Sequence, residues 1–490
     1  MTSLGADTRR LLQQTHEAYL GTDHEEEVEN LLERFDEPLR VAIAGKVKAG
    51  KSTLLNALVG ARVAATDATE CTRLVTWYQD GLVYDVAVHD KSGQSTRGAI
   101  TVENDQATID LGANAPEHIE RLLVTWPSQE LLSKTLIDSP GIGSLSRDVS
   151  AVSVDFLSPE DEETPADAVL YLMKHLHGED IELLRSFHDV EVSQANPINA
   201  IGVLSRADEI GAGRADAMDS AHRVASRMSS DPVIRQLVQT VIPVAGLLGE
   251  TAATLTEAEF QAIRSLAELA PTEVDLLLLS TDRFTSEEAD AVLSPEQRQN
   301  LLDRFAIFGI RTATSAIRSG RVSTAKELSD ELVAVSGLGR LRQILETLFV
   351  DRRFVLKSRS ALLALQALYS SSPAPDGDAL AAELERIIVS DHSIEELRTL
   401  SAVRGGWVTG KPEVLAELER LLGSEGQSAQ ARLDLGPYDD AVTIRAAALD
   451  TISRWRRRAD NPISSSQMAA ASHVAIRSCE GIVAEIEDKK

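Results

Sequence analysis

The sequence predicts an α/β domain built around a phosphate-binding loop, followed by an elongated all-α helical bundle that forms a neck and trunk. Three observations predict this architecture. The apolar run 39–44 leads directly into a glycine-rich loop and then a helix-forming run. Strand-like runs alternate with helical patterns over residues 37–285, which is typical of a mostly parallel sheet covered by helices. From about residue 287 onward, apolar residues recur at helical spacing to the end of the chain.

The length of the chain and these patterns divide it into three parts. A chain of 490 residues is too long for one hydrophobic core, so two or three domains are expected. We expect N-terminal neck helices over 1–36, the α/β domain over 37–285 and the helical neck and trunk over 286–490. Shorter runs at 77–81, 83–89 and 100–102 predict additional antiparallel strands.

The helical part contains one long amphipathic pattern. Apolar residues over 338–370 predict a single helix about 50 Å long. We also expect the N-terminal helices to pack with the C-terminal helix near the α/β domain, which would form the neck.

Composition excludes several classes of protein. The net charge of −27 and the aromatic content of 4% disfavour nucleic-acid binding. The two cysteines, Cys71 and Cys479, lie far apart in sequence, which favours a reducing cytoplasm over a disulfide framework. No run approaches 18 apolar residues, so any lipid contact is expected to be peripheral.

The glycine-rich loop follows the pattern G-x-x-x-x-G-K-S. Glycines allow backbone N–H groups to turn toward a β-phosphate, and the following helix adds partial positive charge. Lys51 is expected to reach the β- and γ-phosphates, and the Ser52 hydroxyl to bind Mg²⁺. A chance glycine-rich turn is the alternative, which the strand–loop–helix order disfavours. The residues predicted to contact nucleotide are Gly45, Lys46, Gly50, Lys51, Ser52 and Thr53.

A second motif, D-S-P-G at 138–141, follows another apolar run. Asp138 is predicted to lie behind the direct ligands of Mg²⁺. The Gly141 N–H is predicted to face the γ-phosphate, where no side chain would fit.

A third motif, S-R-A-D at 205–208, resembles the guanine-recognition pattern N/T-K-x-D, and Ser205 takes its first place. Asp208 would accept two hydrogen bonds from guanine, a pair of donors that adenine does not offer. Arg206 would lay its stem and guanidinium over the base. A simple helix cap is the alternative for such a tetrapeptide. The order of the three motifs at strand ends favours the contact with the base.

Thr72 is predicted to close over the γ-phosphate and to give Mg²⁺ a second hydroxyl. It lies in a polar loop just before the run 74–78. Thr66 and Thr69 are rivals for this role, and Thr72 could instead simply begin the strand.

Together these motifs resemble those of the dynamin superfamily, and in particular the bacterial dynamin-like proteins. The resemblance implies a P-loop GTPase domain that hydrolyses GTP to GDP and phosphate with Mg²⁺. Thr72 and the loop that ends at Gly141 would orient the attacking water, and Lys51 with Mg²⁺ would neutralise the developing charge. It also implies a homodimer formed through the GTPase domains and remodelling of a phospholipid membrane. A sister dynamin-like protein is a possible partner. The expected location is the cytoplasm, peripheral on the inner face of the cell membrane.

One departure from the family pattern lies in the phosphate loop. Eukaryotic dynamins carry a Gln-Ser pair where this chain has Val47 and Lys48. Lys48 could place its own ammonium near the bridging oxygen of the triphosphate. The alternative is a solvated Lys48 without a catalytic role.

Two segments are candidates for lipid contact. The loop 404–411 places Trp407 between Arg404 and Lys411, a composition suited to the membrane interface. The cluster 454–458 is rich in arginine. For both, the alternative is ordinary packing and pairing with the surplus of acidic side chains.

The function that the sequence favours is a GTPase that couples hydrolysis to domain pairing and membrane remodelling. One alternative is a nucleotide-controlled scaffold with vestigial hydrolysis, which Val47 and Lys48 would suit. Another is a P-loop GTPase in ribosome or RNA handling, which the acidic charge disfavours.

Overall fold

The computed structural model describes most of the chain. The described residues are 3–64, 74–103, 106–111, 118–139, 166–174, 199–211, 213–235, 237–287, 292–373, 377–404 and 406–488.

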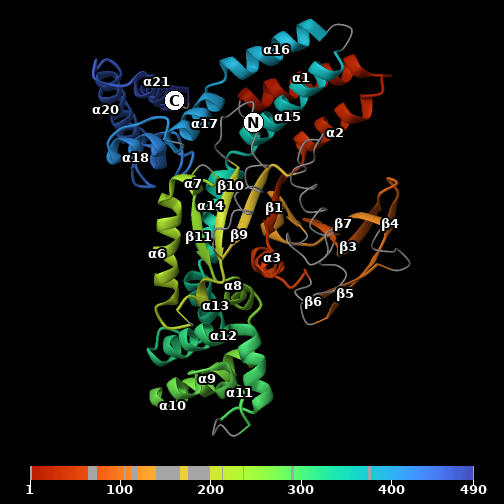
Figure 1. The fold of residues 1–490 in the computed structure, drawn as a ribbon, viewed down its shortest axis with the longest axis vertical. Helices are drawn as coiled ribbons and strands as arrows, with labels where there is room; N and C mark the ends of the chain where they lie inside the picture. The colour runs from red at the N-terminus through yellow and green to blue at the C-terminus, as the bar shows by residue number, and fades with distance from the viewer. Residues whose placement is uncertain are drawn as a thin grey trace.

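A nine-stranded mixed sheet forms the centre of the molecule (Figure 1). Its strand order is β11-β10-β9-β1-β8-β2-β7-β3-β4, and β5 and β6 form a separate hairpin. The five strands β11, β10, β9, β1 and β8 run parallel, whereas β2 is antiparallel to β8 and parallel to β7. The strands are β1 (Leu39–Gly45), β2 (Val75–Gln79), β3 (Asp85–Asp90), β4 (Ser95–Arg97), β5 (Ala99–Glu103), β6 (Gln106–Asp110), β7 (Ile119–Thr125), β8 (Lys134–Asp138), β9 (Ala168–Met173), β10 (Ala200–Ser205) and β11 (Val241–Val244).

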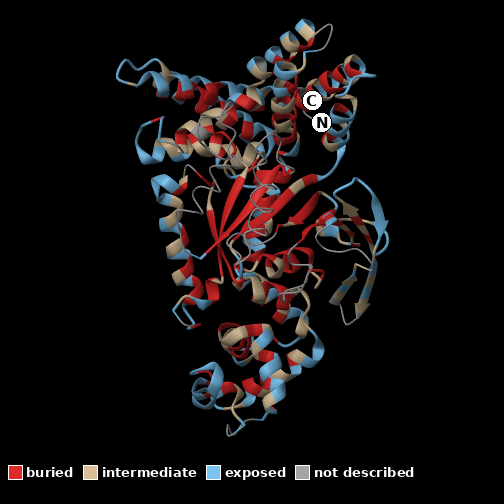
Figure 2. Cartoon of the chain, turned by 45° about the vertical axis from the view of Figure 1, so that its right-hand side comes forward, coloured by how far each residue is buried: buried red, intermediate tan, exposed pale blue. Residues whose placement is uncertain are grey.

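Alternating side chains of β1 enter two different cores. Val41 and Ile43 lie in one core with α3 and α14, whereas Ala42 and Ala44 lie in the other with α6. This is the pattern expected of a strand that is covered by helices on both faces. Figure 2 shows the same arrangement, with buried strands between helices that expose only their outer faces. The predicted α/β fold followed by helices is confirmed.

The helices occupy both ends of the sheet (Figure 1). They are α1 (Ser3–Tyr19), α2 (Glu25–Asp36), α3 (Lys51–Val59), α6 (Ala217–Ser230), α7 (Pro232–Arg235), α8 (Gly246–Ala253), α9 (Glu257–Glu268), α10 (Pro271–Leu277), α11 (Thr281–Thr285), α12 (Pro295–Arg318), α13 (Ala325–Val335), α14 (Leu338–Leu345), α15 (Arg353–Ser371), α16 (Gly377–Ser390), α17 (His392–Arg404), α18 (Pro412–Leu421), α19 (Ala429–Leu433), α20 (Ala441–Ala459) and α21 (Ser466–Asp488).

Helices α9 to α13 form a lobe below the sheet in Figure 1, which we call the lower lobe. Their apolar side chains, among them Phe305 and Leu328, share one core with the sheet. Helix α14 packs against α3 and β11. The packing therefore does not change at the predicted boundary between residues 285 and 286. Helices 295–345 belong with the α/β domain because their apolar faces cover it.

The N-terminal helices do not have the partner that the sequence suggested. Leu11 of α1 and Phe35 of α2 share a core with Leu362 of α15 and Leu384 of α16. The C-terminal helix α21 instead packs on α20, α17 and α18. The expected pairing of the N-terminal helices with the C-terminal helix is thus wrong. In this structure α15 and α16 present the apolar face that covers α1 and α2.

The predicted single helix over 338–370 is interrupted. Helix α14 gives way to a π-helical segment over 346–350, and α15 begins at Arg353. The wider i→i+5 turn of a π-helix changes which face of the following helix points inward. Here α14 lies on the sheet domain and α15 lies on the N-terminal helices.

The C-terminal helices place the predicted lipid-contact loop beside the sheet domain. Trp407 is 63% exposed, and Lys411 is also exposed. Arg404, predicted as a lipid-facing cation, is instead mostly buried. Its Nε lies 3.2 Å from Glu419, and its Nη1 donates to Gln239 at 3.3 Å. A carboxylate held this close satisfies the guanidinium, so Arg404 is not a free cation in this arrangement.

Two arginines of the cluster over 454–458 also pair with carboxylates, at more exposed positions. Arg454 contacts Glu417 and Asp450, and Arg456 contacts Glu480 at 2.8 Å. Trp455 is fully buried and donates to Glu417. These pairs favour the structural interpretation of the cluster over lipid binding.

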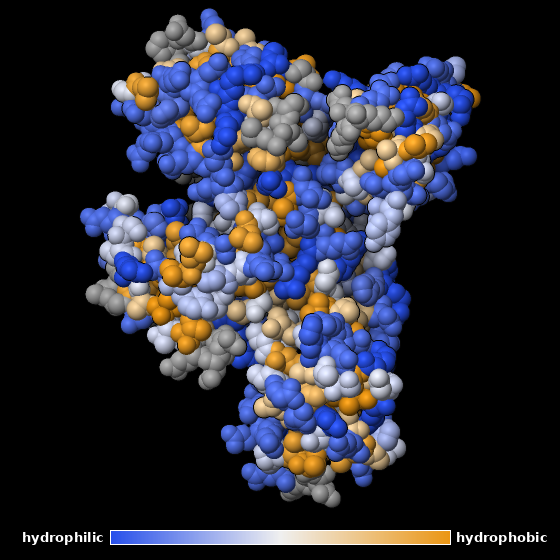
Figure 3. Space-filling model, turned by 180° about the vertical axis from the view of Figure 1, so that it is seen from behind, coloured by the Kyte–Doolittle hydropathy of each residue, from blue (hydrophilic) through white to orange (hydrophobic). Residues whose placement is uncertain are grey.

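The wing that carries β3 to β6 exposes apolar side chains between hydrophilic ones (Figure 3). Leu82, Val83 and Tyr84 are exposed in the loop between β2 and β3. Elsewhere hydrophilic residues dominate this view, as the acidic composition leads us to expect. Among the described helices, none combines the length and the apolarity needed to cross a membrane.

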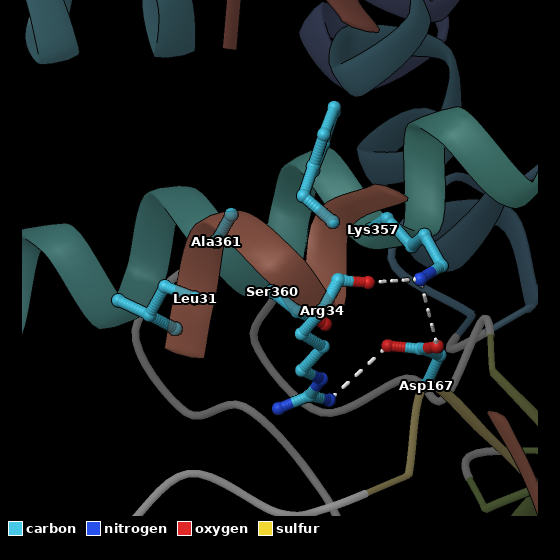
Figure 4. Close-up of a pocket in the computed structure, with 7 residues that line it drawn as sticks. Leu31, Arg34, Asp167, Lys357, Ser360 and Ala361 are labelled. Carbon is cyan, nitrogen blue, oxygen red and sulfur yellow. Dashed lines mark hydrogen bonds and ion pairs between the residues drawn. The ribbon is translucent and has the colours of Figure 1, made fainter. Parts of the chain in front are cut away.

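The helices α1, α2, α15 and α16 pack together and form the neck. A buried ion-pair cluster joins this neck to the sheet (Figure 4). Asp167, just before β9, accepts from Arg34 of α2 at 3.1 Å and from the backbone N–H of Arg40 at 2.9 Å. Lys357 of α15 lies 4.0 Å from Asp167 and donates to the Arg34 carbonyl. Burial lowers the pKa of Lys357 to about 8, against the opposing effect of Asp167.

This lowered pKa predicts a pH-dependent stability. Between about pH 8 and the ordinary value of 10.5, the unfolded chain binds a proton at Lys357 that the folded chain does not. The contribution of Lys357 to the free energy of unfolding should therefore rise with pH across this window, by up to about 3 kcal/mol. Urea unfolding at pH 7.5 and pH 10, for the wild type and Lys357→Met, measures it. Equal pH slopes for the two proteins would contradict the assignment.

Candidate functional site

The phosphate loop leaves the sheet at Gly45, where only glycine fits. A Cβ there would lie 2.6 Å from the carbonyl oxygen of Leu172 in the neighbouring strand β9, and the φ of Gly45 is +146°. Lys48 and Gly50 also have positive φ, at 62° and 93°. Successive backbone turns of this kind point N–H groups to one side, which forms a cradle for an anion. Helix α3 then begins at Lys51, so its N-terminus faces the same point.

Three predicted residues meet at the carboxyl ends of β1 and β8. The Ser52 hydroxyl donates to Asp138 Oδ2 at 2.8 Å, and Lys51 Nζ donates to the Gly45 carbonyl at 3.2 Å. Burial lowers the pKa of Lys51, and the nearby Asp138 opposes this shift. Burial likewise raises the pKa of Asp138, against the effects of Lys51 and Ser52. A phosphate beside Lys51 and a cation beside Asp138 would each favour the charged form of these buried groups.

These side chains fit a magnesium ion. Mg²⁺ prefers hard oxygen ligands and commonly takes only one or two from protein, with the rest from phosphate and water. Ser52 supplies a hydroxyl, and the carboxylate of Asp138 lies directly behind it. Asp138 Oδ1 is buried and has no hydrogen-bond partner in the described part of the chain. An ordered water on a magnesium ion would satisfy it.

A cavity of about 250 Å³ continues from the phosphate loop toward the third motif. Its wall includes Gly50 and Thr53 on one side and Ser205, Arg206 and Asp208 on the other. Asp208 is buried, and burial raises the pKa of its carboxyl group. The buried Ser205 hydroxyl has no partner among the described residues. The Ser205 hydroxyl needs a polar partner, and a ligand in the cavity could both supply it and donate to the buried Asp208 carboxylate.

Arg206 links the third motif to the phosphate loop. Its φ is +52°, its Nη2 donates to the Lys48 carbonyl at 3.0 Å, and its Nη1 lies 3.0 Å from Glu209. The guanidinium therefore bridges the two ends of the cavity. The side chain of Lys48 is exposed, although its backbone is fixed by this bond.

Several predicted residues have no described position. Thr72, with its rivals Thr66 and Thr69, and Gly141 lie outside the described residues. Lys46, within the phosphate loop, is described and is partly buried. The roles predicted for all of these residues stay predictions.

Comparison with known proteins supports the assignment suggested by this geometry. The model of the dynamin family matches residues 41–182, the stretch that carries the phosphate loop and Asp138. The isoniazid-induced protein IniC of Mycobacterium tuberculosis, strain CDC 1551 / Oshkosh, is 38% identical over 457 residues, or 93% of this chain and 92% of IniC. IniC of strain H37Rv matches to the same extent.

The chain belongs to the dynamin family. This confirms the resemblance drawn from the motifs and identifies the α/β domain as a dynamin-type GTPase domain in a bacterial dynamin-like protein similar to IniC. A solved structure of an oligomerised bacterial dynamin pair, described as sensing and tethering membranes over long range, covers 98% of this chain and is itself covered to 91%. It is 13% identical with a TM-score of 0.34, which is too low to support an argument.

In this dynamin-family protein a buried polar network lies beside the site, and sequence reasoning missed it. Glu250 of α8 accepts from Arg62 at 3.1 Å and from Asn56 of α3 at 3.4 Å, and it lies 3.9 Å from Arg304 of α12. Asn56 in turn accepts from the backbone N–H groups of residues 63 and 64. The network thus fixes the segment that leads into 65–73, where Thr72 lies. The only signal in the sequence was a polar Asn in an otherwise apolar helix face.

Removing the charge of Glu250 should destabilise the domain. Glu250→Gln leaves Arg62 without its buried counter-charge and leaves Arg304 with Glu259 alone, so we expect a loss of about 2 kcal/mol or more in the free energy of unfolding. Thermal unfolding measures it, with the exposed Glu257→Gln on α9 as the matched control. If both variants melt together with the wild type, the network is not a structural support.

Proposed function

We propose that this dynamin-family protein binds GTP, hydrolyses it to GDP and phosphate with Mg²⁺, and couples pairing of its GTPase domains to binding and remodelling of a membrane. One observation carries the nucleotide assignment. The cavity runs from a phosphate cradle at Gly50 to a buried carboxylate at Asp208, and the unpartnered Ser205 hydroxyl lies beside that carboxylate. A triphosphate and a guanine base need these two kinds of group at the two ends.

The residues of the site have separate roles in this proposal. The turned backbone of the loop binds the phosphates, and Lys51 neutralises charge on their oxygens. Ser52 and Thr72 would hold Mg²⁺, with Asp138 behind Ser52. When bound, Mg²⁺ supplies positive charge that offsets the charge developing on the phosphate oxygens. Thr72, through its backbone carbonyl, and the Gly141 loop position the attacking water. Lys48, an exposed residue of the loop, is available to add a further positive charge.

Asp208 selects the base because it is buried and charged. As a carboxylate it accepts two hydrogen bonds from guanine, whereas adenine would leave the buried charge unpaired. Arg206 keeps this motif in register with the phosphate loop through the Lys48 carbonyl. The choice of nucleotide therefore depends on the distance between the phosphate loop and the S-R-A-D motif, and the side chain of Arg206 connects the two.

The membrane part of the proposal is supported by family membership and by the form of the chain. A helical region joined to the GTPase domain, with Trp407 exposed on its surface, offers a peripheral contact with phospholipid at the inner face of the cell membrane. Arg404 would join that contact only if its bonds to Glu419 and Gln239 were released. Pairing with a second copy or with a sister dynamin-like protein would bring two such regions together.

Asp208→Asn should remove the preference for guanine. Without the carboxylate the preference for GDP over ADP should fall by about 100-fold. In the wild type, GDP affinity should also fall as the pH drops, because the raised pKa of Asp208 means that its carboxylate is protonated sooner than an exposed one. Fluorescent nucleotide binding between pH 5 and 8 measures both effects. The exposed Asp216→Asn is the control, and an unchanged preference in Asp208→Asn would exclude the assigned base contact.

Hydrolysis measured against protein concentration tests the whole proposal. We expect GTP turnover per molecule to rise with concentration, to rise further with acidic liposomes, and to be abolished by Lys51→Ala. The exposed Lys326→Ala on α13 should turn over normally. Constant turnover per molecule at all concentrations would refute catalysis by domain pairing, and normal turnover by Lys51→Ala would refute the site. No turnover by folded wild type, together with tight GTP binding, would favour the nucleotide-controlled scaffold.

A further inference from the structure

Helix α12 is interrupted where it passes the base end of the cavity. Ala306 has φ 49° and ψ 179°, a conformation far from helical. This region is essentially restricted to glycine, and an alanine in it costs on the order of 1–3 kcal/mol. Of the described residues that line the cavity, Ala306 alone comes from beyond residue 247.

The surroundings of Ala306 hold the interruption in place. The buried Thr251 of α8 donates its hydroxyl to the carbonyl of Arg304, two residues before the break. Arg304 itself bonds Glu259 at 2.7 Å and the Thr254 carbonyl at 3.0 Å. The Thr251 hydroxyl thus bonds a backbone carbonyl just before the break, and the side-chain bonds of Arg304 tie the same point to α9 and to the end of α8.

Close packing fixes the other side of the break. A Cβ on Gly309 would lie 2.7 Å from Leu248 of α8, so the two helices touch through a glycine. A Cβ on Gly213, in the loop after Asp208, would lie 3.5 Å from the backbone nitrogen of Phe308. Helix α12 therefore contacts both α8 and the turn that carries Asp208, which are the two sides of the base end of the cavity.

We infer that the interruption of α12 at Ala306 forms a wall of the guanine pocket, and that the lower lobe thereby takes part in selecting and holding the base. This inference rests on the proposed function, because it assumes that the cavity binds a guanine nucleotide. Ala306 is a specificity-determining residue in this scheme. The strained backbone thus places a small side chain, that of Ala306, in the wall of the cavity.

A substitution in this wall should affect binding of the base and leave binding of the phosphates unchanged. A larger side chain at Ala306 should obstruct the base but leave the phosphate cradle open. Ala306→Leu in the full-length chain should therefore lower the affinity for a fluorescent GDP by at least about tenfold, as expected when a packed site is overfilled. The affinity for inorganic tripolyphosphate, which has no base, should not change. Ser315→Leu, at an exposed position of the same helix, should bind both probes like the wild type.

The smaller variant tests the same wall without overfilling it. Ala306→Gly removes one methyl group, so GDP affinity should fall about fourfold while tripolyphosphate binding stays constant. Its melting temperature should not fall below that of the wild type, because glycine adopts the positive φ without strain. This variant also decides the matter if Ala306→Leu does not fold.

The outcomes separate this inference from the proposed function. Wild-type protein that binds no GDP removes both. Wild-type binding combined with unchanged GDP affinity in folded Ala306 variants overturns this inference alone. Equal loss of GDP and tripolyphosphate binding also overturns it, since the substitution would then act on the whole site and not on a wall at the base.

Discussion

The close approach of Leu172 to Gly45 is the constraint on which the site depends. Strands β1 and β9 lie so close where β1 ends that any side chain at residue 45 would collide with a carbonyl oxygen. The chain must leave the sheet there without a Cβ. The positive φ values at Lys48 and Gly50 then turn it back into α3 within a few residues. The phosphate cradle, the orientation of Lys51 and the contact of Ser52 with Asp138 all follow from this exit.

The direction of the parallel strands gives the molecule two different ends. Gly45, Asp138 and Ser205 lie at the carboxyl ends of their strands, as ligand sites do in open α/β sheets. The neck joins at the opposite ends, where Asp167 precedes β9 and binds Arg34. Strand β9 thus runs from the neck cluster to Leu172 beside the phosphate loop. Such a strand spans about 20 Å at about 3.3 Å per residue, so a stiff element of one chain connects the two ends.

The sequence predicted the strands and the phosphate loop because each depends on residues that are close in the chain. The strand 168–173 reads as six buried apolar residues, and the loop carries its own glycines. Which helix covers which surface was not predictable in this way. The amphipathic pattern of 295–335 shows that the helices need a partner, but the same pattern suits a sheet face and a helical bundle equally well. The partners of α1 and α2 were misjudged for the same reason.

The base end of the site was the part that the sequence predicted least completely. Asp208 and Arg206 were found because their motif is contiguous, whereas Ala306 and Glu250 reach the site only through folding. An alanine in a helical pattern gives no sign that its φ is positive, since alanine is the best helix former. Thr251 and the packing at Gly309 impose that conformation from neighbouring elements.

Buried ion pairs connect the GTPase domain to the helices at both of its ends. Asp167 with Arg34 and Lys357 holds the neck, and Glu250 with Arg304 holds the lower lobe. Buried pairs add little net stability compared with apolar packing, because both charges lose their hydration, yet breaking one partner is costly. The apolar core also continues from the sheet into the lower lobe, and a charged pair at the junction is satisfied in only a few geometries. Apolar packing and these ion pairs together therefore hold the helical regions in defined orientations on the sheet.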